Sequence, residues 1–411
     1  MTKMTLSEEL QWRGFINQTT LENIEEFDNK EWTFYHGFDA SADSQAIGNL
    51  AAMMLDLVFI GHGHKAFLLA GGATSLVGDP GGKDKERPLQ TEEVIRSNVA
   101  AAESQLQSIF GSHDFTLVNN LDWFKNINIL DFLRDTGKHY GISTLVQRDY
   151  IQQRIGEGGA GMSYTEFSYT LLQGYDYNYL YEEYGVNLQL SGSDQWGNCL
   201  SGVELVRKVH GQVVHALTMP LIINKATGKK FGKSEDGAVW LDESKTSVFD
   251  FYQFWLNVDD EGVGDYLKIY TAIEPEAYDS LIAELNGAPQ ERAAQKYLAM
   301  EVTALVHGRE RAERAERISN VLFSDSPFAD LSAGDVSEMK LQLPTTKEIH
   351  ILDALVDSEL CSSKSEARRM VEAGAVTING EKADLGTQIQ ATDNGAALIK
   401  RGKNKFALVS D

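Results

Sequence analysis

The sequence is poor in cysteine and contains no long apolar run. Cys199 and Cys361 are the only cysteines among 411 residues, so no disulfide framework is expected and a reducing, cytoplasmic compartment fits. No apolar run approaches the roughly 20 residues that a helix needs to cross a bilayer. The first residues, MTKMTLSEELQWRGF, also lack the apolar core of a secretion signal. These absences predict a globular protein that has no membrane partner.

Positive charge is scarce as well. The chain has 37 lysines and arginines against 60 aspartates and glutamates, a formal net charge of -23, which argues against nonspecific coating of nucleic acid. Residues 340–411 differ, because their ten basic and ten acidic side chains balance. A comparatively basic tail on an acidic body predicts a separate module with a separate partner. No cluster of residues has zinc-ligand spacing, so no protein-bound metal is expected.

Strands and helices alternate through the first half of the chain. Residues 33–39 (TFYHGFD) and 115–120 (FTLVNN) read as strands, and residues 42–60 between them have helical spacing. This alternation predicts a parallel α/β sheet, in which ligands bind at the carboxyl ends of the strands. We predict a Rossmann-like parallel-sheet catalytic domain (1–225), a loop and connector (226–247), an α-helical domain (248–322), a Ser/Asp/Pro-rich linker (323–346) and a small α+β domain (347–411).

Polar side chains share one face of a predicted helix in SYTEFSYTLLQGYDYNYLY. Tyr169, Gln173 and Asp176 lie at i, i+4 and i+7 of this stretch. An aromatic core helix would explain the tyrosines, but not a glutamine and an aspartate on the same stripe, because buried polar groups need partners. A polar ligand that carries an ammonium and a hydroxyl group would supply those partners.

Two further clusters follow strand-like stretches. In LSGSDQWGN, Asp194 and Gln195 come directly after an apolar strand, where an aspartate can accept hydrogen bonds from ribose hydroxyls. In GGATSLVGDPGGKDKER, Asp79 precedes Lys83 and Arg87. Either stretch alone is also consistent with an ordinary turn at the end of a strand.

A third cluster, GKKFGKSEDG (228–237), crowds lysines around glycines in an acidic chain. Such a segment is often a solvated surface. The functional interpretation is a mobile loop whose ammonium groups close over a polyphosphate.

Together these stretches resemble the bacterial tyrosyl-tRNA synthetases of class I. FYHGFDASADS, GGATSLVGDP, TEFSYTLLQGYD, SGSDQWGN, KFGKS and ALVHG match in order over nearly the whole chain. The resemblance implies a tyrosine–tRNA ligase that converts L-tyrosine and ATP, with accompanying Mg²⁺, into tyrosyl-adenylate and pyrophosphate. The tyrosine is then transferred to the 3′ end of tRNA(Tyr) in protein synthesis. It also implies a homodimer, with an interface in the connective region at about 120–165.

The resemblance assigns roles to matching residues. The tyrosine-binding residues are Tyr35 and Asp176 at the phenol, Asp79, Tyr169 and Gln173 at the α-ammonium, and Gln195 at the carboxylate. The ATP-binding residues are Gly37, Asp39, Gly48, Asn49, Gly192, Asp194 and Lys233. The residues that would stabilise charge on the departing pyrophosphate are Lys83, Arg87, Lys230, Lys233 and Ser234.

The chain departs from the family at the His-Ile-Gly-His element, where it reads Ala46-Ile47-Gly48-Asn49. Asn49 can still form hydrogen bonds, but Ala46 cannot contact a phosphate, and one lost transition-state donor costs about 2.7 to 4 kcal/mol. Gln45 lies about 100° around a helix and is not expected to replace it. His36 stands where the family usually has cysteine. Two alternatives to an active tyrosine–tRNA ligase remain. One is an impaired paralogue or variant that binds tyrosine or tRNA. The other is a tryptophan-specific relative, which is disfavoured because Tyr35 and Asp176 are placed for a phenolic hydroxyl.

The tail resembles a small RNA-binding fold first known from a ribosomal protein. Lys364, Arg368 and Arg369 lie on a predicted helix, and a second basic group follows at 400–405. A run of charge is often only a solvated face. Together with the family match, however, the module predicts contacts with the tRNA backbone that weaken as salt rises.

Overall fold

The computed structural model describes residues 4–80, 90–234, 237–324 and 326–410. The chain forms two compact units, Met1–Thr246 with Val258–Leu298, and Ser247–Asn257 with Ala299–Asp411. Within the described residues, no helix combines the length and the apolar character that a membrane span requires.

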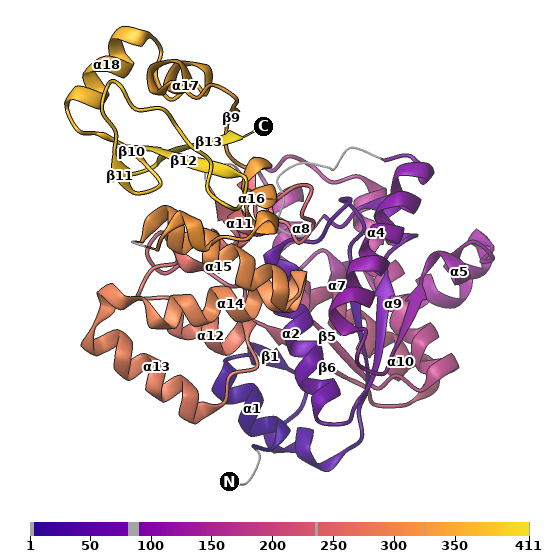
Figure 1. Cartoon of the computed structure of the whole chain (residues 1–411). Helices are drawn as coiled ribbons and strands as arrows, with labels where there is room; N and C mark the ends of the chain where they lie inside the picture. The colour runs from indigo at the N-terminus through magenta and orange to yellow at the C-terminus, as the bar shows by residue number, and fades with distance from the viewer. Residues whose placement is uncertain (1–3, 81–89, 235–236, 325, 411) are drawn as a thin grey trace. The chain divides into compact units, whose positions relative to one another are not determined.

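The first unit is built on a six-stranded sheet in the order β1-β6-β5-β2-β3-β4; β1, β5 and β6 are labelled in Figure 1. Only β1 runs antiparallel to its neighbour, so the predicted parallel α/β sheet is confirmed. The strand order reverses between β2 and β5, which is where parallel sheets open a crevice for ligands. The strands are β1 (Gln18–Thr19), β2 (Thr33–Phe38), β3 (Lys65–Ala70), β4 (Phe115–Asn119), β5 (Leu188–Gly192) and β6 (His215–Met219).

Helices cover both faces of this sheet. Neighbouring residues of β2 point to opposite faces: Phe34 packs on Phe59 of α2, while Tyr35 meets Tyr177 of α9 with ring centroids 5.1 Å apart. The helices of the unit are α1 (Leu6–Arg13), α2 (Ile47–Gly61), α3 (Thr74–Val77), α4 (Glu92–Phe110), α5 (Leu121–Phe124), α6 (Ile129–Asp131), α7 (Ile142–Leu145), α8 (Asp149–Ile155), α9 (Tyr164–Tyr184), α10 (Trp196–His210), α12 (Val263–Tyr270) and α13 (Pro275–Gly287).

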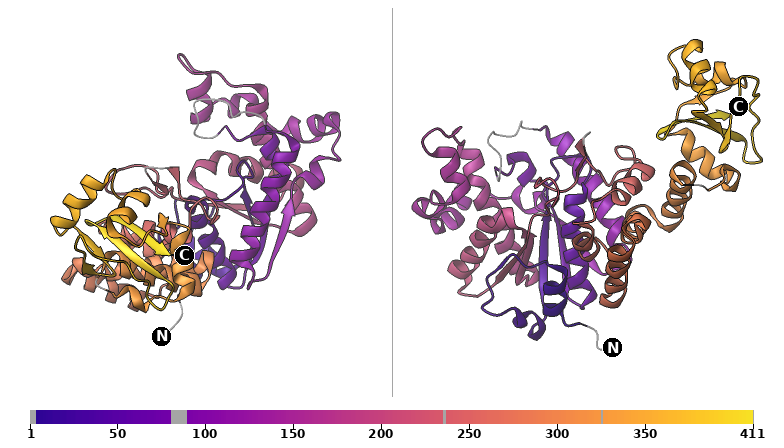
Figure 2. Two further views of the ribbon diagram at one scale, coloured as in Figure 1. Left: turned by 45° about the horizontal axis from the view of Figure 1, so that its top comes forward. Right: turned by 90° about the vertical axis from the view of Figure 1, so that its left-hand side faces the viewer.

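The second unit contains a five-stranded sheet in the order β11-β10-β12-β13-β9, whose two C-terminal strands, β12 and β13, are yellow in Figure 2. Its strands are β9 (Thr345–Thr346), β10 (Val376–Ile378), β11 (Glu381–Lys382), β12 (Ala396–Arg401) and β13 (Lys405–Ser410). Its helices are α11 (Val248–Leu256), α15 (Arg309–Phe323), α16 (Ala333–Lys340), α17 (Ile351–Asp357) and α18 (Lys364–Glu372), and α14 (Ala293–His307) spans the boundary between the units.

Both faces of this second sheet are apolar and covered. Ile399 and Val409 pack with α17 and α18 on one face, whereas Leu398 and Phe406 pack with α15 and α16 on the other. Alternate residues of β12 and β13 therefore point to opposite faces of the sheet and pack in two different hydrophobic cores.

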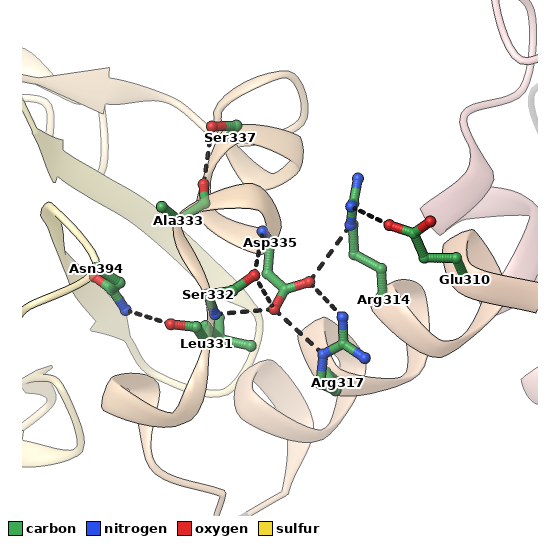
Figure 3. A network of polar contacts seen from close by, with 9 residues as sticks. All are labelled: Glu310, Arg314, Arg317, Leu331, Ser332, Ala333, Asp335, Ser337 and Asn394. Atoms are coloured by element: carbon green, nitrogen blue, oxygen red, sulfur yellow. Dashed lines mark hydrogen bonds and ion pairs between the residues drawn. The ribbon is translucent and has the colours of Figure 1, made fainter.

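Residues 323–346, which the composition predicts to be a linker, differ from that prediction because they contain α16. Ser332 caps this helix, and the carboxylate of Asp335 accepts a hydrogen bond from the Ser332 amide at 2.9 Å. The same carboxylate accepts from Arg317 Nη2 at 2.8 Å and lies 3.5 Å from Arg314 Nε (Figure 3). Leu331 O accepts from Asn394 Nδ2 at 3.3 Å. Contacts distant in sequence, which composition does not report, therefore order the segment.

The predicted helical stretch 248–322 is helical but does not form one unit. Residues Val258–Leu298 belong to the first unit, and the rest belongs to the second. The domain boundaries drawn from the sequence remain a prediction.

Replacing Asp335 by alanine is expected to loosen the segment 333–340. The variant keeps the Ser332 cap but loses the carboxylate half of the capping box and both arginine contacts, so backbone amide exchange in α16 should accelerate about tenfold. Hydrogen exchange followed by mass spectrometry measures this. Glu310→Ala is the matched control, because Glu310 also pairs with Arg314 but is 85% exposed and should change little. Equal exchange rates in both variants would contradict the assigned role of Asp335.

Candidate active site

A cavity of about 450 Å³ opens at the carboxyl ends of β2, β3, β5 and β6 in the first unit. The predicted site residues that line it are Tyr35, Gly37, Asp39, Gly48, Asn49, Asp79, Tyr169, Gln173, Asp176, Gly192, Asp194, Gln195 and Lys230. Lys83 and Arg87 lie outside the described residues, and of Lys233 and Ser234 only the backbone, which forms β7 (Lys233–Ser234), is described. The structure thus gathers residues from across the first 230 positions around one cavity.

Helix α9 carries three of the polar residues into this cavity. The helix begins after Ser163, whose Oγ accepts a hydrogen bond from the amide of Glu166 at 3.2 Å, while the Glu166 carboxylate accepts from the Ser163 amide. It ends at Gly185 in the left-handed conformation (φ 68°). Tyr169, Gln173 and Asp176 all line the cavity, as their spacing on one helix face predicts.

Asp176 is fully buried and held by two donors from the segment that follows β4. Its carboxylate accepts hydrogen bonds from Asn120 Nδ2 at 3.1 Å and from Trp123 Nε1 at 2.9 Å. Burial raises the pKa of Asp176 to about 7, and the hydrogen bonds from Asn120 and Trp123 work against that rise. The group therefore titrates near neutral pH rather than near pH 4.

Two buried polar atoms on the neighbouring strands have no hydrogen-bond partner among the described residues: Tyr35 Oη and Gln189 Oε1. The two residues are direct cross-strand partners on β2 and β5, and both line the cavity. An unpaired buried polar group costs about 1 to 3 kcal/mol. A ligand with a polar group at this depth would remove that cost.

Sequence reasoning missed Asn120, Trp123 and Gln189. A signal existed for two of them. Asn120 is the last residue of the predicted strand FTLVNN, and Gln189 is the polar residue inside the apolar stretch LQL. Trp123 had no signal, because an indole in an amphipathic stretch is usually a core residue.

The carboxylates at the open side of the cavity are oriented by neighbouring donors. Asp79 Oδ2 accepts from Gln195 Nε2 at 2.6 Å. Asp39 Oδ1 accepts from the Ser41 amide at 2.9 Å and from Ser75 Oγ at 3.0 Å. These contacts hold acceptors toward a ligand that can donate hydrogen bonds.

The Ala46–Asn49 element forms the first turn of α2. Asn49 Oδ1 accepts from the amide of Ala46 at 3.1 Å, so the amide nitrogen is the end of this side chain that is left for a ligand. Gln45 is buried, and its Nε2 donates to Asp39 O at 3.1 Å. Gln45 does not lie around the helix as predicted, because it precedes Ala46, the N-cap residue of α2; its side-chain amide is instead bonded to the main chain.

The lysine-rich loop lies against the start of α2. Val239 O accepts from the Ile47 amide at 3.1 Å, and Val239 N donates to Gly232 O at 3.0 Å. Gly232 has φ 95°, and a Cβ there would lie 2.8 Å from Ile47 Cγ1, so glycine is required for this approach. Phe231 stacks on Tyr266 at 4.1 Å between ring centroids. These contacts bring Lys230 to the rim of the cavity.

His36 also lines the cavity, and its ring contacts the buried carboxylate of Asp56. Its Nδ1 lies 2.9 and 3.0 Å from the two oxygens of Asp56 on α2. Burial raises the pKa of Asp56, and the nearby His36 opposes that rise. The imidazole ring is stacked on Phe38 at 4.7 Å. These contacts fix the ring plane of His36.

The geometry can be compared with known proteins. The family described as tRNA synthetases class I (W and Y) matches residues 27–324, and a tyrosine–tRNA ligase C-terminal domain family matches residues 330–409. The tyrosine–tRNA ligase of Staphylococcus epidermidis is 44% identical, over 98% of both chains. That of Geobacillus kaustophilus is 42% identical, over 99% of both.

Solved structures agree with these matches. A C-terminally truncated mitochondrial tyrosyl-tRNA synthetase of Aspergillus nidulans is 29% identical with a TM-score of 0.71, covering 78% of this chain and 95% of its own. A tyrosyl-tRNA synthetase of Archaeoglobus fulgidus has a TM-score of 0.56 at 13% identity, covering 75% of this chain and 99% of its own. That second likeness concerns the fold alone.

The chain belongs to the bacterial tyrosyl-tRNA synthetases, within class I of the aminoacyl-tRNA synthetases. Its activity is that of a tyrosine–tRNA ligase, with tyrosine, ATP and tRNA as substrates. The function predicted from the sequence motifs is thereby confirmed.

Proposed function

We propose that the cavity of the first unit binds the tyrosine phenol between Tyr35 and Asp176 and there forms tyrosyl-adenylate. The observation that carries this proposal is the buried polar pair at the cavity floor. Tyr35 Oη has no partner among the described residues, and the Asp176 carboxylate is already oriented by two donors. A phenol that donates to Asp176 and accepts from Tyr35 would satisfy both groups. Phenylalanine would leave them unpaired, which is the physical basis of its rejection.

The remaining polar residues suit the other end of the amino acid. Asp79, Tyr169 and Gln173 would receive the α-ammonium, since they combine a carboxylate with neutral acceptors on one side of the cavity. Gln195 would lie beside the substrate carboxylate. That arrangement directs the carboxylate toward the nucleotide part of the cavity.

The nucleotide would occupy the part lined by Gly37, Asp39, Gly48, Asn49, Gly192 and Asp194. Attack of the tyrosine carboxylate on the α-phosphorus forms one P–O bond and breaks the bond to pyrophosphate, so positioning and charge neutralisation matter most. The Asn49 amide would donate to a phosphate where Ala46 cannot. Lys230, with Lys233, Ser234, Lys83 and Arg87, would stabilise the departing pyrophosphate. Mg²⁺ would arrive with ATP and share the phosphate charge.

A homodimer through the region 120–165 is part of the proposal. Among the described residues, an apolar surface supports it, because six large apolar side chains of this region are exposed to solvent: Ile129, Leu130, Leu133, Ile142, Ile155 and Tyr164. Several large exposed apolar side chains within one short region suit an interface. We also place the protein in the cytoplasm, since both cysteines are free and buried.

The C-terminal sheet and its helices would contact the tRNA backbone. Arg368, Arg369, Lys403 and Lys405 are exposed and suit phosphate contacts. The neighbouring Arg401 is instead paired with Glu366 at 2.6 Å, and Lys400 Nζ donates to Leu322 O at 3.2 Å. These two predicted basic residues have structural partners, so the exposed four are the better candidates for tRNA contacts.

Amino-acid-dependent exchange of labelled pyrophosphate into ATP tests the proposed site. We expect exchange with tyrosine, and none above background with phenylalanine or tryptophan at the same concentrations. The Tyr35→Phe variant should bind tyrosine more weakly, and its preference for tyrosine over phenylalanine should be smaller than that of the wild type. A Tyr35→Phe enzyme that keeps the full preference would show that the phenol lies elsewhere.

A further inference from the structure

A chain of four hydrogen bonds runs from the connective region into the candidate active site. Arg148 Nη1 donates to Thr170 Oγ1 at 3.1 Å. Thr170 Oγ1 donates to Asn198 Oδ1 at 2.8 Å, and Asn198 Nδ2 donates to Gln195 Oε1 at 3.0 Å. Gln195 Nε2 then donates to Asp79 Oδ2 at 2.6 Å. Each of the three residues between Arg148 and Asp79 therefore accepts a hydrogen bond from the residue before it and donates one to the residue after it.

The direction of the chain follows from the chemistry of its two ends. A guanidinium can only donate hydrogen bonds, and an ionised carboxylate can only accept them. With Arg148 at one end, Thr170 must present its lone pair to the arginine and its proton to Asn198. Asn198 must then turn its oxygen toward Thr170 and its nitrogen toward Gln195. The orientation of both side-chain amides is thus determined by the arginine and the carboxylate together.

Burial makes this orientation costly to change. Thr170 is 1% exposed and Asn198 is 5% exposed, so neither side chain can exchange its partner for bulk water without leaving a buried group unpaired. If Gln195 rotated its amide by 180°, its oxygen would face the Asp79 carboxylate. Two acceptors would then oppose each other at the amino-acid end of the cavity.

Arg148 is well placed to serve as the origin of the chain. It precedes α8 (Asp149–Ile155) as the N-cap residue and reaches across the first turn of α10, where a Cβ added at Gly197 would lie 3.6 Å from Arg148 Cδ. A second donor, Nη2, bonds Ser201 Oγ on the same helix. The arginine thus contacts both α9 and α10.

We propose that Arg148 is a positioning residue for the tyrosine site, acting through Thr170, Asn198 and Gln195 to hold Asp79 toward the substrate. The residue belongs to the connective region rather than to the cavity, so the conformation of that region affects binding of the amino-acid end. This inference rests on the proposed function, because it assumes that Gln195 and Asp79 bind tyrosine.

Thr170→Val tests the inference, since valine keeps the shape of threonine and removes only the hydroxyl. Loss of one buried hydrogen bond in the chain should raise KM for tyrosine about five- to tenfold, while KM for ATP and kcat in pyrophosphate exchange stay within about twofold. Thr170→Ser should return KM for tyrosine to near the wild-type value. Arg148→Met, at a half-buried position, should reproduce the effect of Thr170→Val without touching the buried helix face.

Two further variants separate the possible outcomes. Gln195→Ala should raise KM for tyrosine by itself, and adding Thr170→Val to it should change KM by less than about twofold, because the chain no longer reaches Asp79. Thr303→Val is the matched control, as that hydroxyl is buried in the second unit and has no partner among the described residues. It should leave all constants unchanged.

Three results would overturn the inference. If Thr170→Val and Arg148→Met leave KM for tyrosine unchanged while Gln195→Ala raises it, the chain has no positioning role and the proposed tyrosine site stands. If Gln195→Ala also has no effect, the proposed site fails together with the inference. A parallel loss in kcat and in both KM values would show general damage to the helix packing rather than positioning.

Discussion

Replacing Lys230 by alanine is expected to lower the rate of tyrosyl-adenylate formation by about 10²- to 10³-fold. Lys230 lines the cavity at the loop that packs on the start of α2, where its ammonium would meet charge that develops on pyrophosphate. An interaction made mainly in the transition state changes the rate and leaves ground-state binding intact. Tyrosine affinity should therefore remain unchanged.

Single-turnover kinetics with saturating tyrosine and ATP measures this rate directly. Lys229→Ala is the matched control, because Lys229 is an exposed neighbour outside the residues that line the cavity. It should react at close to the wild-type rate. An equal loss in both variants would indicate a general effect of loop charge, and a normal rate in Lys230→Ala would remove this lysine from the proposed mechanism.

Tyrosine affinity is expected to fall steeply with acid below about pH 7. The pKa of Asp176 is raised to about 7. Its two oxygens already accept hydrogen bonds from Asn120 and Trp123, so a proton on either oxygen would set donor against donor and remove the charged acceptor that the phenol needs. A carboxyl group is ionised above its pKa, so each pH unit below 7 reduces the binding-competent fraction about tenfold. At pH 5 the affinity should be about 100-fold weaker than its plateau above pH 8.

The midpoint of that pH dependence should move when a donor to Asp176 is removed. The hydrogen bond from Trp123 lowers the pKa of Asp176, so Trp123→Phe should shift the midpoint to higher pH and weaken binding at pH 7. Titration calorimetry with tyrosine in the absence of ATP measures both curves. Trp12→Phe serves as control, since Trp12 packs on Tyr278 and does not contact Asp176. A midpoint that moves to lower pH in Trp123→Phe would contradict the assignment.

The start of α2 shows what the Ala46–Asn49 element can still offer a phosphate. The side-chain oxygen of Asn49 is occupied by the Ala46 amide, so Asn49 presents a donor, as a neutral imidazole can. Gln45 is buried and bonded to Asp39 O rather than lining the cavity, and the alanine at position 46 has no side-chain donor. In the proposed mechanism the transition-state charge would therefore depend more heavily on the lysine loop, which is why we expect Lys230 to have so large an effect.

The helix face and the strand ends of the site could be predicted because they follow local rules. Tyr169, Gln173 and Asp176 come together through helix periodicity, and Asp194 and Gln195 follow a strand whose carboxyl end lies in the crevice. Their partners could not be predicted in the same way. Asn120 and Trp123 are more than 50 residues from Asp176, and no local pattern reports such a contact.

The sequence by itself determined the alternation of strands and helices, the polar stripe on α9 and the glycine-bounded lysine loop, because periodicity and backbone freedom are properties of neighbouring residues. Only the tertiary structure decided that Tyr35 and Gln189 lie side by side on neighbouring strands at the cavity. It also decided that Asp335 orders a segment with the composition of a linker. The connection from Arg148 to Asp79 through three intervening side chains likewise exists only in the folded chain. Burial and hydrogen-bond pairing act between residues far apart in the chain, so they exist only once the elements have packed.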